Sequence, residues 1–125
     1  MTIQNVIDRV DRLRPNYMDR DLKVAYLQDL DQMVYNEVLL KHKHEAAEEV
    51  PPDYSGDRTG ETKLLVPEPY TEMYIHWLCA KIDLMNQEID KYNNDTALFQ
   101  TAYGTMCDWW NRTKMPIGAL PHFKL

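Results

Sequence analysis

Apolar residues recur every three or four positions through most of this chain, and this spacing restricts the fold more than any other feature of the sequence. A period of 3.6 residues places such side chains on one face of an α-helix. The first apolar series is Ile3, Val6, Ile7, Val10 and Leu13. Thr2 is available as the N-cap of this helix, and Pro15 is expected to end it.

A second helix is predicted to begin after Asp19 and to continue to about Lys41. Its apolar face consists of Leu22, Ala25, Tyr26, Leu30, Met33 and Val34. Three further residues, Leu27, Val38 and Leu39, widen that face. A wide apolar face is typical of a helix that packs on more than one side.

The helical spacing is lost between residues 42 and 69, where six prolines and glycines interrupt a polar stretch. They are Pro51, Pro52, Gly56, Gly60, Pro67 and Pro69. This pattern predicts a long central loop. Connections of more than about 15 residues usually have a function or contain a further element. Residues 62–66 are apolar enough to predict a short strand or hairpin arm there.

Pro69 and Thr71 are expected to open a third helix, with Glu72 near the positive end of its dipole. The predicted buried stripe of this helix is Tyr74, Trp77, Leu78, Ile82, Met85 and Ile89. Asn93 and Asn94 are expected to interrupt it, because asparagine favours turns.

Asn94 or Asp95 is expected to cap a fourth helix. Its apolar face is Phe99, Ala102, Tyr103, Met106 and Trp110. Met115, Pro116 and Gly118 are expected to end it. Residues 117–125 then predict an extended C-terminal tail. The apolar residues of this tail need a surface on the same domain or on a partner, and they include Leu120, Phe123 and Leu125.

These segments predict an all-α fold, a small bundle of about four helices that forms one domain over residues 1–125. A chain of 125 residues with 44% hydrophobic residues can form one core. At this size about two-thirds of the unfolded surface is buried on folding. Contacts with neighbouring subunits can therefore add to its stability.

The net charge of −6 disfavours stable binding to DNA, because phosphate contacts need clustered Lys and Arg. An acidic wall nevertheless suits a conduit through which DNA slides without binding. The chain shows neither a signal-peptide pattern nor the roughly 18 consecutive apolar residues of a membrane span. Cys79 and Cys107 lack a metal or disulfide spacing. We therefore expect no membrane partner, and a cytoplasm, or a particle assembled there, as the location.

The nearest approach to a metal site is the run that follows the second helix, with His42, His44, Glu45 and Glu48. Imidazole and carboxylate groups on one helix face are compatible with zinc or manganese. Neighbouring lysines oppose a cation, however, and alternating charges at a helix end are usually solvated. We favour the solvated interpretation and expect no metal or cofactor.

His76 lies in the third predicted helix, where Glu72 or Asp83 could assist it as a general base. The chain contains no Gly-x-Ser-x-Gly, no P-loop and no glycine-rich dinucleotide turn. We therefore favour a packing role for His76 and expect no enzymatic activity.

The aromatic residues of the second half recur at helical spacing without interleaved basic residues, which favours core packing over base stacking. Trp109 and Trp110 are adjacent, and therefore about 100° apart on a helix. They cannot both face one core. One of them is expected to meet another element or another subunit.

Several motifs in the second half resemble those of a known family. They are LLVPEPY at residues 64–70, KYNND at residues 91–95, Phe99, Tyr103, and Arg112 through Met115 and Pro116. With these motifs, residues 64–116 resemble the head-tail connector proteins (head completion or adaptor proteins) of phages and prophages of Gram-positive bacteria.

The resemblance implies a structural virion protein of the phage neck, made in the host cytoplasm. Such proteins form a ring, typically dodecameric, beneath the portal protein, extend the DNA channel, and provide a docking platform for a downstream neck or tail protein. DNA passes through the ring without specific binding. By analogy, residues 121–125 would dock into the portal or an adjacent subunit.

The candidate partner-binding residues are Trp109, Trp110, Leu120, Phe123 and Leu125. The candidate loop residues facing the channel or the adjoining ring are Asp53, Asp57 and Glu61. Two other interpretations remain open. One is a phage-encoded helical module that binds a host protein as a regulator or inhibitor. The other is a small metal-dependent enzyme using His42 and His44.

Overall fold

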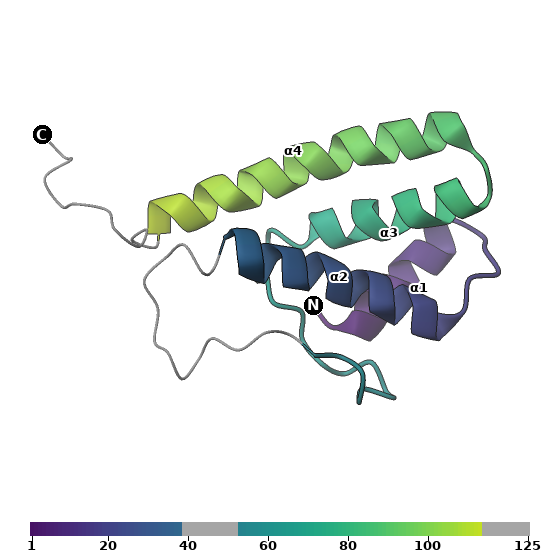
Figure 1. Ribbon diagram of the computed structural model, residues 1–125, viewed down its shortest axis with the longest axis horizontal. Helices are drawn as coiled ribbons and strands as arrows, with labels where there is room; N and C mark the ends of the chain where they lie inside the picture. The colour runs from purple at the N-terminus through teal and green to yellow at the C-terminus, as the bar shows by residue number, and fades with distance from the viewer. Residues whose placement is uncertain (39–52, 114–125) are drawn as a thin grey trace, which may run out of the picture.

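The computed structural model describes residues 1–38 and 53–113, which form four helices (Figure 1). These are α1 (Ile3–Leu13), α2 (Arg20–Glu37), α3 (Glu72–Met85) and α4 (Ile89–Thr113). Within the described residues the β pairing is limited to one isolated antiparallel bridge, between Thr2 and Lys63. The prediction of a small all-α bundle is confirmed, whereas the strand predicted at residues 62–66 is reduced to this bridge.

Helix α3 lies at the centre of the bundle and packs against each of the other three helices. Helix α4 runs alongside α3 in the opposite direction and approaches neither α1 nor α2 closely along its backbone (Figure 1). The core is made by the apolar faces of α1, α2 and α3, with Met106 as the buried apolar residue of α4. One long side of α4 therefore faces away from the bundle.

Helix α1 begins as its sequence predicts. The Thr2 hydroxyl accepts a hydrogen bond from Asn5 N at 3.2 Å, and the Asn5 side chain accepts one from Thr2 N at 3.0 Å. This reciprocal capping box satisfies two backbone donors that lack partners inside the helix. The predicted apolar face is buried except for Leu13, which is 52% exposed because the helix ends there, just before Pro15.

Helix α2 begins directly after Asp19, as predicted. Its buried apolar residues are Val24, Leu27, Leu30 and Val34. Leu22 and Ala25, which were expected on the buried face, are exposed, because α1 and α3 cover only one side of α2. The predicted extension to Lys41 lies outside the described residues, and Val38 is the C-cap.

The boundary between the third and fourth helices differs from the prediction. Helix α3 ends at Met85 and α4 begins at Ile89, so Asn93 and Asn94 lie inside a helix. The turn is a Schellman motif in which Gln87 N donates to Leu84 O and Glu88 N donates to Asp83 O. Gln87 occupies its left-handed position with φ 60°, where glycine is usual, so the sequence carries no ordinary stop signal there. Met85 and Ile89 are consequently exposed rather than part of a buried stripe.

The described part of the central loop packs against the start of α1. Ile3 N donates to Thr62 O at 3.0 Å, and Gln4 N donates to Gly60 O at 2.9 Å. Gly60 has φ +78°, and a Cβ on it would lie 2.7 Å from Gln4 Cβ. Only glycine fits this close approach. The loop also places Tyr54, Leu64 and Val66 in the core, so residues 53–71 pack as part of the bundle.

Candidate functional site

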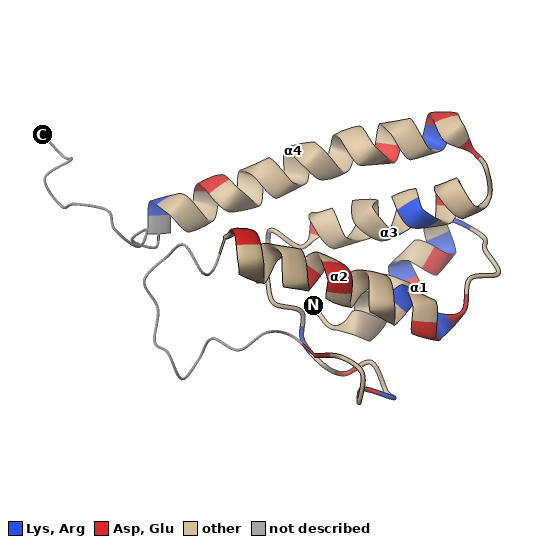
Figure 2. Cartoon of the chain, in the orientation of Figure 1, with Lys and Arg blue, Asp and Glu red and all other residues tan. Residues whose placement is uncertain are grey.

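The exposed side of α4 carries no Asp, Glu, Lys or Arg along residues 96–107. Figure 2 shows this stretch as uncharged between acidic residues near both ends of the helix. Its exposed residues are Ala97, Leu98, Gln100, Thr101, Gly104 and Thr105, and we call all of them except Gln100, which also lines a groove against α3, the α4 outer face. They recur at the spacing of one helix face. Three turns without a charge are unusual on a helix side that faces solvent.

The polar groups of the α4 outer face are satisfied within the helix itself. The Thr101 hydroxyl donates to Ala97 O at 3.2 Å, and the Thr105 hydroxyl donates to Thr101 O at 3.0 Å. Around Gly104, no atom lies within 4 Å of the position that a Cβ would take. The small side chains therefore leave a shallow surface on which a second helix can pack closely.

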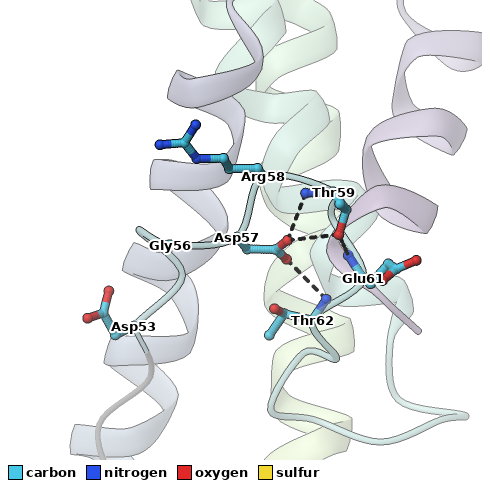
Figure 3. Close-up of a pocket in the computed structure, with 7 residues that line it drawn as sticks. All are labelled: Asp53, Gly56, Asp57, Arg58, Thr59, Glu61 and Thr62. Atoms are coloured by element: carbon cyan, nitrogen blue, oxygen red, sulfur yellow. Dashed lines mark hydrogen bonds between the residues drawn. The ribbon is translucent and has the colours of Figure 1, made fainter.

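The loop of residues 53–62 is organised around Asp57, whose hydrogen bonds to Thr59 and Thr62 are drawn in Figure 3. Asp57 accepts hydrogen bonds from the backbone N–H groups of Thr59 at 3.1 Å, Gly60 at 2.7 Å and Thr62 at 3.0 Å. Hydrogen bonding by Thr62, and then by Gly60 and Thr59, lowers the pKa of Asp57 to about 2. The Asp57 carboxylate therefore stabilises the conformation of the loop by accepting hydrogen bonds from three of its backbone N–H groups.

The other two acidic residues predicted for this loop point elsewhere. Asp53 accepts hydrogen bonds from Ser55 N at 3.0 Å and Ser55 Oγ at 2.7 Å, which lower its pKa. Glu61 is exposed. The carboxylates of Asp53 and Asp57 do not converge on one point (Figure 3). Across the described residues, no three His, Cys, Asp or Glu side chains are grouped to hold a metal ion. His42, His44, Glu45 and Glu48 lie outside those residues.

The adjacent tryptophans near the end of α4 take different environments, as their spacing predicts. Trp109 stacks on Tyr70, which precedes α3, with ring centroids 4.8 Å apart. Trp110 meets Trp109 edge-on, with centroids 5.2 Å apart, and is half-buried. Trp109 thus contacts another element of the same chain. The remaining candidate partner-binding residues, Leu120, Phe123 and Leu125, lie outside the described part of the chain.

His76 is half-buried on α3, and its burial lowers its pKa. Its acidic neighbour Glu72 is paired with Arg9, whose guanidinium lies 3.1 Å away. Asp83, the other acid considered for it, pairs with Arg14 instead. Both acidic residues considered for His76 are therefore engaged in ion pairs with arginines, one at the surface and one buried.

A buried charge cluster joins α1, α3 and α4. Arg14, at the C-cap of α1, places its Nε 3.2 Å from Asp83 of α3 and its Nη2 3.2 Å from Asp95 of α4. The side chains of Asp83 and Asp95 are 1% and 3% exposed. One guanidinium therefore faces two buried carboxyl groups. Asp95, predicted as a helix cap, is instead the residue that ties the first turns of α4 to the bundle.

The two carboxyl groups do not both ionise easily. Burial, and then the neighbouring Asp83, raise the pKa of Asp95 to about 7. The second oxygen of Asp95, Oδ2, has no hydrogen-bond partner in the described structure. Burial likewise raises the pKa of the adjacent Cys79 thiol to about 11, so Cys79 is not a reactive thiolate.

Replacing Asp95 by asparagine is expected to make stability less dependent on pH. The folded pKa of about 7 exceeds the ordinary 3.8, so the folded protein binds more protons between these values. Wild-type stability then falls as pH rises from about 4 to about 7. Across this window the free energy of unfolding of the Asp95→Asn variant should rise relative to that of the wild type by on the order of 4 kcal/mol, with no further change above it.

Urea unfolding at intervals from pH 4 to pH 8 measures this difference. The matched control is Asp90→Asn, an exposed aspartate in the first turn of the same helix. Parallel stability profiles for the wild type and Asp95→Asn would contradict a raised pKa at this position.

A second buried network centres on Asp31 of α2, which is fully buried. Its carboxylate accepts hydrogen bonds from the hydroxyls of Tyr54 and Tyr74, the latter at 2.6 Å, and from Leu65 N at 3.0 Å. The Tyr74 hydroxyl also accepts one from Val66 N at 2.9 Å. Burial raises the pKa of Asp31, and these donors oppose that shift. The network links Tyr54, Leu65 and Val66 of the central loop to Asp31 of α2 and Tyr74 of α3 by hydrogen bonds.

Sequence reasoning missed both buried networks. Asp31 lies between Leu30 and Val34, and Asp83 follows Ile82, so each carboxylate interrupts an apolar helix face. A charge on such a face is the available signal, because a buried carboxylate needs partners. The signal does not name those partners, which come from other elements.

Comparison of the chain with protein-family models, with curated proteins and with solved structures found no match. No helix within the described residues combines the length and apolarity needed to cross a membrane. The functional conclusion therefore depends on the surfaces described above and on the motifs of the second half.

Proposed function

We propose that this chain is a structural subunit of a phage neck, which forms a ring beneath the portal and provides a docking platform for the next neck or tail protein. The observation that carries this proposal is the α4 outer face. A 25-residue helix packed on one side, with a charge-free middle on the other, suits contact with a neighbouring subunit. The resemblance of residues 64–116 to head-tail connector proteins points in the same direction.

A ring can be built from a modest contact of this kind. In a cyclic assembly each subunit offers one patch to its neighbour and a different patch to the neighbour on its other side. The portal ring would raise the effective concentration of subunits, so that a weak contact closes into a stable ring. The chain by itself is then expected to be monomeric in dilute solution.

The 53–62 loop suits the wall of a DNA channel or the contact with the adjoining ring. Asp57 holds its shape, while Asp53 and Glu61 are exposed. Carboxylates near the channel would repel phosphate and let DNA pass without binding. Trp109, Trp110 and the apolar residues of the C-terminal segment are the proposed contacts with the portal.

Quantitative mass spectrometry of particles of the phage that encodes this chain tests the proposal. The copy number of the chain is compared with that of the portal protein in the same particles. Roughly equal copy numbers are expected for a ring stacked on the portal. Absence from the particles would reject the proposal and favour the alternative, a helical module bound to a host protein.

Replacing Gly104 by arginine is expected to prevent ring formation while leaving the fold intact. Arginine has a higher helix propensity than glycine, and no atom obstructs its Cβ. Inside a helix–helix contact it would bury an unpaired charge, which weakens association at least about tenfold. Light scattering of the chain mixed with portal rings, with circular dichroism of the free chain, measures both effects.

The matched control is Asn94→Arg, which adds the same charge to the exposed side of α4 outside the uncharged stretch. It should assemble as the wild type does. Normal assembly of Gly104→Arg would show that the α4 outer face is not the subunit contact.

A further inference from the structure

A second surface lies on the side of α4 that faces α3. There the two helices line a groove of about 220 Å³. Helix α3 contributes Trp77 and Lys81 to this α3–α4 groove, and α4 contributes Tyr92, Thr96, Phe99 and Gln100. The centre of the groove, at Phe99, lies about 160° from Thr101 around the helix. Gln100 at the edge of the groove lies beside Ala97 and Gly104, so the groove adjoins the α4 outer face along this one residue.

The apolar part of the groove is held rigidly. The rings of Trp77 and Phe99 lie with centroids 5.1 Å apart and planes tilted by 49°. Trp77 Nε1 donates a hydrogen bond to the backbone carbonyl of Tyr26 at 2.8 Å, which fixes the orientation of the indole. A partner that packs on these rings therefore meets side chains that are already ordered, which reduces the entropy lost on binding.

Lys81 is held at the edge of the same groove. Its ammonium lies 4.4 Å from the ring centroid of Trp77 and 5.4 Å from that of Tyr26. Both contacts are cation–π interactions, which orient the charge without neutralising it. Among the described residues no carboxylate lies within ion-pair distance of Lys81, whereas nearby Lys91 pairs with Glu88 at 2.7 Å.

Of the described residues that line the groove, Lys81 alone carries a charge, since the others have aromatic, small or amide side chains. The chain as a whole has a net charge of −6. A single unneutralised cation beside an aromatic floor thus differs in charge from its surroundings. The groove therefore complements a ligand that combines a carboxylate with an apolar group.

Apolar surface continues from the groove toward the α3–α4 turn. Leu84 lies seven residues after Trp77, and Ile89 lies seven residues before Thr96, so each extends the same helix face by two turns. They are 47% and 54% exposed. A ligand that covers this surface is longer than one side chain, and the groove itself is smaller than the ~300–1,000 Å³ pockets that enclose small-molecule ligands.

We propose that the α3–α4 groove docks an acidic peptide segment of a partner protein. A large apolar side chain of that segment packs on Trp77 and Phe99, and a neighbouring carboxylate pairs with Lys81. The rest of the segment follows the apolar surface over Leu84 and Ile89. This interaction requires no ring, because every residue involved belongs to one subunit.

Titration of the full chain with two capped octapeptides tests the proposal. One contains the core Glu-Leu-Phe-Glu, and the other contains Gln-Leu-Phe-Gln between the same flanking residues. Nuclear magnetic resonance, observed at the Trp77 indole N–H, measures affinity at low salt and again at high salt. We expect the acidic peptide to bind at least about fivefold more tightly at low salt, with that preference reduced at high salt.

Two variants separate the charge of Lys81 from its packing. Lys81→Met retains an unbranched apolar side chain and should bind both peptides equally, whereas Lys91→Met, a lysine outside the groove, should keep the fivefold preference. Gln100→Glu adds a negative charge at the edge and should weaken the acidic peptide at least about threefold. Its side chain is exposed, so the fold is unaffected.

Equal affinity of the two peptides for the wild type would overturn the proposal, as would an undiminished preference in Lys81→Met. Protection of the Trp77 indole that increases with protein concentration, without any peptide, would identify a second copy as the occupant and also overturn it. None of these results depends on ring formation, so failure here leaves the proposed neck function to its own test.

Discussion

Replacing Arg14 by methionine is expected to lower the free energy of unfolding by about 3–5 kcal/mol at pH 7.5, the cost of removing one partner from a buried ion pair. The guanidinium is the cation paired with both Asp83 and Asp95, whose side chains are nearly inaccessible to solvent. Without it, two carboxyl groups remain together inside the protein. Urea unfolding followed by circular dichroism measures the change.

Two further variants identify the cause of this loss. Arg12→Met removes an exposed arginine two residues earlier and should change stability by no more than about 0.5 kcal/mol. Adding Asp83→Asn and Asp95→Asn to Arg14→Met should restore part of the lost stability, because no buried charge then lacks a partner. If the triple variant is less stable than Arg14→Met alone, the loss comes from packing of the arginine and not from its charge.

The loss in Arg14→Met should shrink as the pH falls below 7. The pKa of Asp95 is raised to about 7, so this carboxyl group becomes neutral in the folded protein at lower pH. A neutral carboxyl group needs the guanidinium less than a carboxylate does. Asp83 still pairs with Arg14 under these conditions, so part of the loss is expected to persist at pH 5.

Replacing Asp31 by alanine is expected to lower the free energy of unfolding by about 3–4 kcal/mol. The substitution removes the acceptor of two tyrosine hydroxyls and one backbone N–H, all of them buried or partly buried. Each donor left without a partner costs about 1–3 kcal/mol, although the hydroxyls can rotate to reduce this. Urea unfolding compares the variant with Asp29→Ala, an exposed aspartate two residues earlier on the same helix.

A double substitution distinguishes unsatisfied donors from lost volume. Tyr54→Phe should cost less in the Asp31→Ala background than in the wild type, because its hydroxyl no longer has a carboxylate to bind. Equal costs in the two backgrounds would falsify the view that these groups act as one network.

The same network should govern how firmly the central loop is held. Leu65 and Tyr54 belong to the loop, whereas Asp31 and Tyr74 belong to α2 and α3. In Asp31→Ala we expect faster tryptic cleavage after Arg58, an exposed loop residue, under conditions in which the helices remain folded. Unchanged cleavage would mean that the contacts with α1 hold the loop by themselves.

Local sequence patterns were sufficient to predict most of the helices. The period of apolar residues, the Thr2 N-cap and Pro15 act within a few residues of one another, so their effect can be read from the sequence. The second helix begins after Asp19 for the same reason. The four-helix, all-α architecture follows from these local preferences.

The boundary between α3 and α4 was predicted wrongly because tertiary contacts oppose the local preference. Asn93, Asn94 and Asp95 favour a turn, yet α4 continues through them. Asp95 is held there by Arg14, which lies 81 residues away in sequence. The chain turns instead at Gln87, where the backbone bonds of the Schellman motif compensate for the missing glycine.

The candidate surfaces also were predictable from the sequence only in part. The adjacency of Trp109 and Trp110 predicted that one of them would contact another element, and Trp109 does so at Tyr70. The uncharged stretch of residues 96–107 is visible in the sequence, but its exposure depends on the backbone of α4 approaching α3 and neither α1 nor α2. The α3–α4 groove requires side chains from two helices and an orienting carbonyl from a third, Tyr26 of α2.

The sequence by itself therefore determined where the chain is helical and which side of most helices is apolar, since these properties arise from neighbours within about one turn. Only the tertiary structure decided which carboxylates are buried, which charges pair, where α3 ends and which face of α4 remains open. Those outcomes depend on contacts such as Arg14 with Asp95 and Asp31 with Tyr74, between residues 81 and 43 positions apart. The energy of such a contact exists only after the helices have packed, so no local pattern contains it.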